Sequence, residues 1–279
     1  MSFSGGDEYL LYNTTSPVIS FAPEEKARGR EELRKMGLGK EDWFIGFHAR
    51  DNAYLNKWRP QYRDIWSKLD FKNTNIETYL DAASHIAECG GFALRMGAVV
   101  EQPLPETVPD RVIDYATCHR SDFMDIYIAA HCRFFLASST GLGHVPTVFN
   151  RPVIVANHFP YNHTHYRSSD LIVPRTILNK ASGTAVPFFE AQEAGFFAWS
   201  GSASSSGKNS DLYHWGYNDS EDILNGVLDM LDALEGRDAP NGAAEIQDRY
   251  AERYLSHLSN YQLGARLSPR YALKYENLI

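Results

Sequence analysis

The sequence predicts an α/β fold built on a doubly wound, mostly parallel sheet, and two patterns in it support this prediction. Short apolar segments alternate with helical patterns between Trp43 and Asn157, as expected for repeated strand–helix units. The apolar segments are nearly continuous, which is typical of strands covered on both faces. The chain has 279 residues, 43% of them hydrophobic, so it can bury a sizeable core.

Recognisable start and stop signals bound the elements of this region. A charged helix opens at Pro23 and stops at Gly37 and Gly39. Asn75 and Ser121 are suited to cap two further helices. Residues 51–75 show no regular pattern and are expected to form a long aromatic and basic loop. Predicted helices cover residues 24–36, 75–87, 121–130 and 145–149, and predicted strands cover 43–47, 92–97, 111–116, 133–138 and 152–156.

The regular alternation stops after Asn157. Residues 157–217 are rich in His, Tyr, Asn, Ser and Gly and are expected to form an irregular insertion. Within it, residues 171–190 could cover a ligand as a lid, and residues 200–207 form a low-complexity loop. Residues 219–279 are expected to form C-terminal helices, the first capped by Asp219 or Ser220. We therefore predict a single α/β domain over residues 1–279 that carries an insertion and C-terminal helices.

Charge and cysteine content restrict the possible partners and location. The formal net charge of -8 argues against general attraction to nucleic acid or to an anionic membrane. Three cysteines without metal-ligand spacing favour reduced thiols and a cytoplasmic location. The sequence shows no secretory signal pattern and no apolar run of about 20 residues, so we expect no transmembrane segment and at most peripheral contact with the inner membrane.

Three polar side chains follow the first predicted strand, at the edge of the sheet where α/β proteins bind ligands. Arg50 could hold a diphosphate through paired hydrogen bonds. His48 could orient Arg50 or contact a sugar, and Asp51 could hold Arg50 or act as a base. An ordinary explanation stays open, in which Arg50 and Asp51 form an ion pair and His48 is a hydrogen-bonded core histidine.

A second candidate lies between the strand at 133–138 and the next helix, where residues 138–143 read SSTGLG. Hydroxyls and backbone amides in such a turn could bind an anion, although an ordinary capped turn would have the same composition. The carboxyl ends of parallel strands meet at one edge of the sheet, so this turn and Arg50 are expected to converge on one ligand. The candidate binding residues of the turn are Ser138, Ser139, Thr140 and Gly141.

Other charged residues could add to this site. Arg95, at the end of the next strand, could supply a second cation or form a structural salt bridge. Asp125, in the first turns of its helix, could complement the helix dipole or accept from a ligand hydroxyl. The histidines of residues 158–167 lack carboxylates at a recognisable spacing, so we expect a polar or sugar-facing loop and no metal site.

With these blocks in place, the sequence resembles a family of bacterial glycosyltransferases that is linked to surface polysaccharide synthesis. That family is distantly similar to fucosyltransferase-like enzymes of GT-B-type fold. The residues that carry the resemblance are 47–51 (FHARD) with Tyr54, 91–97 (GFALRMG), 121–127 (SDFMDIY), 132–136 (CRFFL), 138–141 (SSTG) and 152–157 (PVIVAN).

The resemblance implies the nucleotide-binding half of a GT-B-type enzyme and an inverting, metal-independent transfer. It implies that Arg50 contacts the diphosphate of a nucleotide-sugar donor, with GDP-sugars favoured, and that His48 lies beside it. It also implies that residues 138–140 contact the phosphates or the sugar. The donor is a substrate, and no cofactor is implied. Asp51 is the first candidate for the base that activates the acceptor, and Asp125 is the second.

The sequence departs from this pattern because only one α/β domain is expected. The acceptor side could come from residues 157–217 together with the N-terminal residues, from a second copy of the chain or from a partner domain. Two alternatives to a glycan-modifying enzyme stay open. One is a non-catalytic module that binds a nucleotide sugar or glycan and acts with a partner chain, and the other is a small α/β enzyme acting on another phosphorylated substrate.

Overall fold

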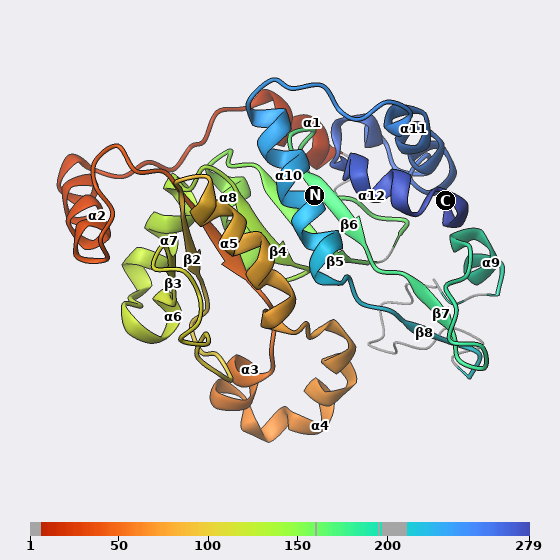
Figure 1. Cartoon of the computed structure of the whole chain (residues 1–279), viewed down its shortest axis with the longest axis horizontal. Coiled ribbons are helices and arrows are strands. Elements are labelled where there is room, and N and C mark those ends of the chain that lie inside the picture. The colour runs from red at the N-terminus through yellow and green to blue at the C-terminus, as the bar shows by residue number, and fades with distance from the viewer. Residues whose placement is uncertain (1–6, 160, 195, 197–210) are drawn as a thin grey trace.

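A seven-stranded parallel sheet forms the centre of the molecule (Figure 1). The computed structural model describes residues 7–159, 161–194, 196 and 211–279. In this part of the chain the strand order is β3-β2-β1-β4-β5-β6-β9, which confirms the predicted doubly wound α/β class. The strands are β1 (Phe44–His48), β2 (Phe92–Arg95), β3 (Val112–Ile113), β4 (Phe135–Ser138), β5 (Val153–His158), β6 (Leu171–Pro174) and β9 (Arg266–Leu267).

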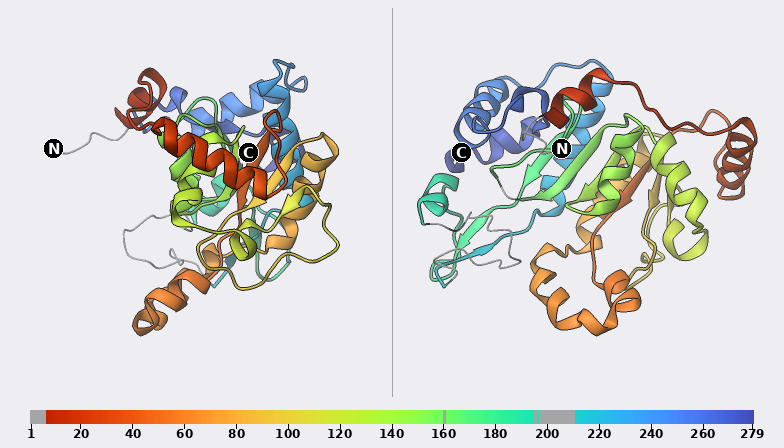
Figure 2. Two further views of the ribbon diagram at one scale, coloured as in Figure 1. Left: turned by 90° about the vertical axis from the view of Figure 1, so that its left-hand side faces the viewer. Right: turned by 180° about the vertical axis from the view of Figure 1, so that it is seen from behind.

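Helices cover both faces of this sheet. Helices α5 (Leu80–Glu88) and α10 (Ser220–Leu234) lie across one face, while α7 (Asp122–His131) and α8 (Val145–Val148) lie on the other (Figures 1 and 2). The remaining α-helices are α1 (Asp7–Thr14), α2 (Pro23–Lys35), α3 (Ala53–Trp58), α4 (Arg63–Trp66), α6 (Tyr115–Cys118), α9 (Phe188–Glu193), α11 (Ala243–Tyr254) and α12 (Pro269–Lys274). Among the described residues, no helix has both the length and the apolar composition needed to cross a membrane.

The helix starts follow from local sequence. The Ser121 hydroxyl accepts a hydrogen bond of 3.2 Å from the Met124 amide and caps α7, as expected. Asp219 and Asp222 cap α10 reciprocally, each carboxylate accepting from the other's backbone amide. These caps satisfy amides that have no partner within the helix.

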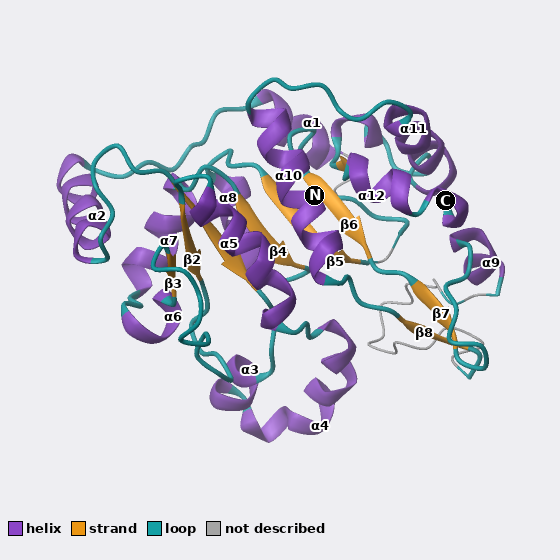
Figure 3. Cartoon of the chain, in the orientation of Figure 1, coloured by secondary structure: helices purple, strands orange, loops and turns teal. Residues whose placement is uncertain are grey.

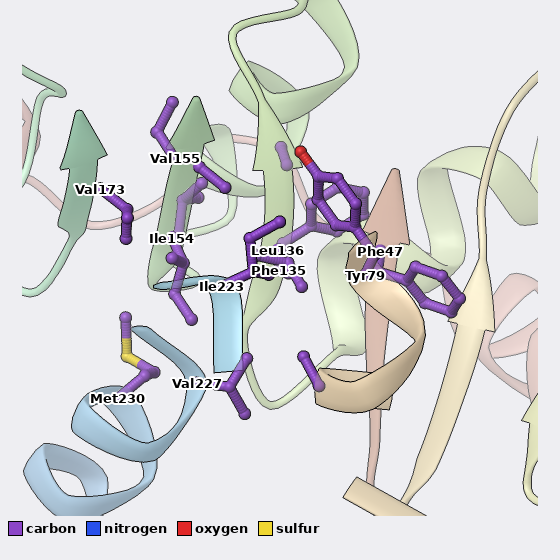
Figure 4. Close-up of a cluster of buried hydrophobic side chains, with 14 of the residues drawn as sticks. Phe47, Tyr79, Phe135, Leu136, Ile154, Val155, Val173, Ile223, Val227 and Met230 are labelled. Carbon is purple, nitrogen blue, oxygen red and sulfur yellow. The ribbon is translucent and has the colours of Figure 1, made fainter. Parts of the chain in front are cut away.

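The core lies between the sheet and the helices on each face (Figure 4). Every residue of β5 is buried, and its first four residues, 153–156, are all apolar, as expected for a strand covered on both faces. Ile223, Val227 and Met230 recur at helical spacing on α10 and pack in the same cluster as Ile154 and Val173. The sheet that carries the strand ends is therefore rigidly supported.

Two expectations for the first half of the chain are corrected. The segment 51–75 is not an extended loop, because it folds into α3, α4 and the short 3₁₀ helices η1 (Pro60–Tyr62) and η2 (Ser67–Lys72). Residues 111–116 form only the two-residue strand β3, and Tyr115 already begins α6. The helices in these segments are three to six residues long, which is too short for a helical repeat to be recognised in the sequence.

The expected irregular insertion also contains regular structure. Residues 171–174, predicted as part of a lid, form β6 inside the main sheet, and the two-residue strand β9 joins its edge. Strands β7 (Ile177–Asn179) and β8 (Tyr213–Trp215) form a separate antiparallel ribbon that projects from the sheet (Figure 3). The expected low-complexity loop at 200–207 lies outside the described residues.

Candidate functional site

The strand order reverses between β1 and β4. From β1 the chain passes outward to β2 and β3, and it then returns to the other side of β1 to form β4. In open α/β sheets, ligands bind beyond the carboxyl ends of the strands at such a switch point. Here the Arg50 amide donates a hydrogen bond of 3.0 Å to the Ser138 hydroxyl. The structure thus brings the two predicted halves of the site into direct contact.

A cavity of about 510 Å³ lies beside this junction. This volume is within the range of about 300–1,000 Å³ that is usual for small-molecule sites. The cavity walls come mainly from the turn after β4 and the segment after β5. The lining comprises Lys72 and residues 138–141, 143, 144, 155, 158, 159 and 162–165. All four turn residues predicted as binding residues therefore line the cavity.

The turn after β4 packs tightly against its own strand. A Cβ atom on Gly143 would lie 2.9 Å from the Ala137 Cβ, whereas one on Gly141 would meet nothing within 4 Å. The Thr140 hydroxyl accepts from the Gly143 amide at 3.4 Å. The buried Ser139 Oγ has no hydrogen-bond partner among the described residues. The turn therefore presents a polar atom that a ligand could satisfy.

Two cations lie close together near this turn: Lys72 lines the cavity, and Arg50 lies outside the cavity lining. Arg50 donates from its guanidinium to the Asn73 side chain, and its carbonyl accepts from the Thr74 amide at 2.9 Å. Burial lowers the pKa of Arg50, while the carboxylates of Asp70 and Asp51 act in the opposite direction. Burial and the charge of Arg50 lower the pKa of Lys72. An anion placed here would stabilise both charges.

His48 and Asp51 make hydrogen bonds within the protein. The His48 Nδ1 lies 3.0 Å from the Met96 carbonyl, and desolvation lowers the pKa of the ring. The Asp51 carboxylate accepts from the amides of Ala53 at 2.9 Å and Glu101 at 3.0 Å. Neither side chain is part of the cavity lining. Their catalytic roles stay predictions.

Arg95 and Asp125 lie apart from the cavity lining. Arg95 is 2% exposed and forms an ion pair of 3.1 Å with Asp114. Asp125 accepts from the Tyr115 hydroxyl at 2.8 Å and from the Arg120 Nε at 3.0 Å. The structure brings neither side chain together with Arg50, so their predicted roles as donor ligand and base stay untested.

A β-bulge directs the histidine-rich segment into the cavity. Asn157 has a φ of 51°, and the register of β5 against β6 shifts there. Asn157 is held by Asn218, which donates its amide to the Asn157 side chain at 2.9 Å and accepts the Asn157 amide at 2.5 Å. The next residue, His158, contacts the His163 carbonyl at 2.8 Å through its Nε2. Burial lowers the pKa of His158 to about 3, so the ring is neutral near pH 7.

The sequence did not predict Lys72 or Asp170 as part of the site. Lys72 ends η2, and nothing in its local pattern separates it from the neighbouring basic residues. Asp170 is fully buried and contacts His165 Nδ1 at 2.6 Å. The sequence around it, Ser168-Ser-Asp170, resembles an ordinary turn. Within the described ranges, no cluster of three or more His, Cys, Asp or Glu side chains is arranged to hold a metal ion.

The fold and the cavity define a doubly wound α/β protein with a pocket at the topological switch point, lined mainly by serine, threonine, glycine and histidine residues and by Lys72. No family model matches the chain, and neither does any curated protein. Among solved structures, the chain is similar to the glycosyl transferase family 9 from Veillonella parvula DSM 2008, with 14% sequence identity and a TM-score of 0.34. The match covers 51% of this chain and 38% of that chain. Similarity at this level assigns neither a family nor an activity.

Proposed function

We propose that the protein is a glycosyltransferase that transfers a sugar from a nucleoside diphosphate donor to a hydroxyl group of a glycan or similar acceptor. The observation that carries the proposal is the cavity at the β1/β4 switch point, which is lined by Lys72 and by Ser139, whose hydroxyl has no hydrogen-bond partner among the described residues. Arg50 lies outside this lining, but it donates its amide to Ser138 and its charge acts on Lys72. The family resemblance of the strand-end blocks adds the nucleotide-sugar donor, with GDP-sugars first.

The diphosphate would bind between the two cations and the turn after β4. Charge-assisted hydrogen bonds from a guanidinium to phosphate oxygens are strong and directional, so Arg50 is the principal contact. Lys72 adds a second positive charge, and Ser139 can donate its hydroxyl to a phosphate oxygen. In this arrangement protein cations neutralise the diphosphate, which fits a metal-independent transfer.

The same groups would assist the chemical step. In an inverting transfer the acceptor oxygen attacks the anomeric carbon, while the bond from that carbon to the diphosphate oxygen breaks. The electron pair of the broken bond leaves on the diphosphate. Arg50 and Lys72 would stabilise the charge that develops there, and stabilisation of developing charge by fixed groups is usually the largest contribution to catalysis.

A non-catalytic nucleotide-sugar or glycan-binding module is the second candidate. The observation that favours it is the position of the two carboxylates expected to act as base: Asp51 binds backbone amides, and Asp125 binds Tyr115 and Arg120. A binding module needs the cations and the turn alone. The two candidates differ in whether bound donor is converted to nucleoside diphosphate.

Calorimetric titration of the purified protein with UDP, GDP and CDP tests the binding that both candidates share. We expect at least one of them to bind, and Arg50→Ala to weaken its affinity by several-fold to about a hundredfold through the loss of a charge-assisted contact. The matched control is Arg34→Ala, on the exposed surface of α2. Absence of binding to all three would remove both candidates, and unchanged affinity in Arg50→Ala would remove Arg50 from the site.

A further inference from the structure

His165, which lines the cavity, forms a buried pair with Asp170, which is not a lining residue. The His165 Nδ1 lies 2.6 Å from Asp170 Oδ2, and the two side chains are 6% and 0% exposed. Asp170 is fixed further by the Val153 amide, which donates to its Oδ1 at 2.9 Å, and by the Arg167 amide, which donates to Oδ2 at 3.2 Å. The carboxylate is therefore anchored at the start of β5 and cannot turn away from the imidazole.

This pairing determines which ring nitrogen carries the proton. An ionised carboxylate only accepts hydrogen bonds, so Nδ1 of His165 must be the donor. In the neutral ring Nε2 is then unprotonated and has a free lone pair. Among the described residues, Nε2 of His165 is a buried atom without a hydrogen-bond partner. A buried nitrogen of this kind is costly unless it serves a ligand or a reaction.

The backbone also fixes His165 in place. Its carbonyl accepts from the Ala265 amide at 3.0 Å, and the Thr164 hydroxyl donates to the Ala265 carbonyl at 2.7 Å. The ring stacks on His144, with centroids 5.2 Å apart and an interplanar angle of 14°. Both rings line the cavity beside residues 138–141. Three contacts therefore fix the imidazole: the carboxylate at Nδ1, the stacked ring of His144 and the backbone hydrogen bond to Ala265.

The other cavity histidines lack this arrangement. His158 is engaged through Nε2 with the His163 carbonyl, which leaves that nitrogen unable to accept a proton from a ligand. Within the part of the chain that the structure describes, neither His144 nor His163 is hydrogen-bonded to a carboxylate. His165 is therefore the imidazole in this wall whose tautomer is set by a carboxylate.

We propose that His165 is the general base of the transfer and that Asp170 is its positioning residue; this inference rests on the proposed glycosyltransferase function. Nε2 of His165 takes the proton of the acceptor hydroxyl while the acceptor oxygen forms its bond to the anomeric carbon. The bond to the diphosphate breaks, and the nucleoside diphosphate leaves with the electron pair. Asp170 stabilises the imidazolium, as a carboxylate does in hydrolase triads.

The first test follows the release of nucleoside diphosphate. The probes are the nucleotide sugars that correspond to whichever of UDP, GDP or CDP the wild-type protein binds, with simple methyl glycosides and water as acceptors. His165→Gln should lower the release rate by about 10²–10⁴-fold, the usual contribution of general base catalysis, while the calorimetric affinity for the nucleoside diphosphate stays within twofold. His119→Gln, an exposed histidine outside the cavity lining, is the matched control.

The second test needs no substrate. Long-range ¹H–¹⁵N spectra of the protein labelled with ¹⁵N-histidine should show His165 protonated at Nδ1 and unprotonated at Nε2. Asp170→Asn should change this tautomer and also lower the release rate. A wild-type ring protonated at Nε2 would overturn the inference even if both variants failed to fold.

The outcomes separate the inference from the proposed function. If His165→Gln binds normally and still releases nucleoside diphosphate at the wild-type rate, His165 is not the general base. The glycosyltransferase proposal would stay intact. If the wild-type protein binds nucleoside diphosphate but releases none from the nucleotide sugar, His165 is not a general base. That result would favour the binding module. If no nucleoside diphosphate binds, the proposed function is wrong. The assignment of His165 as general base is then wrong as well.

Discussion

Arg50 and Arg95 show how two similar residues at neighbouring strand ends acquire different roles. Arg95 ends β2 and Arg50 follows β1, these two strands pair in parallel, and both arginines were predicted as donor ligands. Arg50 lies at the switch point, where its neighbours are Asn73, Ser138 and Lys72. Arg95 lies on the side of β2, where its guanidinium is enclosed by Asp114 and the Gln102 carbonyl. Both arginines are visible in the sequence, but the strand order is not. The strand order places Arg50 at the switch point and Arg95 away from it.

Arg95→Met should destabilise the protein without changing nucleotide affinity. The substitution leaves the largely buried Asp114 without its cation, so we expect the free energy of unfolding to fall by about 3–5 kcal/mol, measured by urea denaturation. Arg95→Lys should recover part of this loss because it restores the charge. A folded Arg95→Met protein with weakened nucleoside diphosphate affinity would show instead that Arg95 contacts the donor.

The turn after β4 shows how packing within an element gives two residues of the same type different roles. The sequence shows the polar composition of this turn, and it predicted that the turn lies between a strand and a helix. It could not predict that the two glycines differ, because the difference comes from packing: Gly143 lies against Ala137 and Gly141 faces open space. Likewise β6 was missed because four apolar residues between Asp170 and Arg175 are too few to distinguish a strand, and β9 has only two residues.

The two glycines of this turn give a matched pair of substitutions. Gly143→Ala should cost about 1–3 kcal/mol in the free energy of unfolding, because its Cβ must displace the turn from β4. Gly141→Ala should leave stability unchanged or raise it slightly, because the new methyl group meets nothing. Urea denaturation of both variants checks the difference. Equal effects would mean that the turn can shift without loss of packing.

At the scale of the whole molecule, stability should depend on pH through buried neutral histidines. The pKa of His158 falls from its ordinary value of 6.5 to about 3 on folding, mainly through burial. Between these values the unfolded chain binds more protons than the folded chain, so stability falls as the pH is lowered. Burial also lowers the pKa of His48 and His131 and adds in the same direction.

Urea denaturation at pH 7 and pH 5 checks this dependence. We expect His158 alone to account for a loss of about 2 kcal/mol between the two conditions. His158→Gln, whose amide can still donate to the His163 carbonyl, should show a shallower dependence. Burial raises the pKa values of Asp222 and Asp229, so these carboxyl groups oppose the trend. If the free energy of unfolding of His158→Gln depended on pH as steeply as that of the wild-type protein, protonation of His158 would not contribute to the dependence.

Both margins of the main sheet are very short. Strands β3 and β9, which close the sheet at its two ends, contain two residues each, and Arg266 on β9 is exposed. Such short margins offer few unpaired backbone groups, so they discourage another chain from extending the sheet by strand addition. Another chain that bound this protein would therefore dock through side chains and not through backbone pairing with the main sheet.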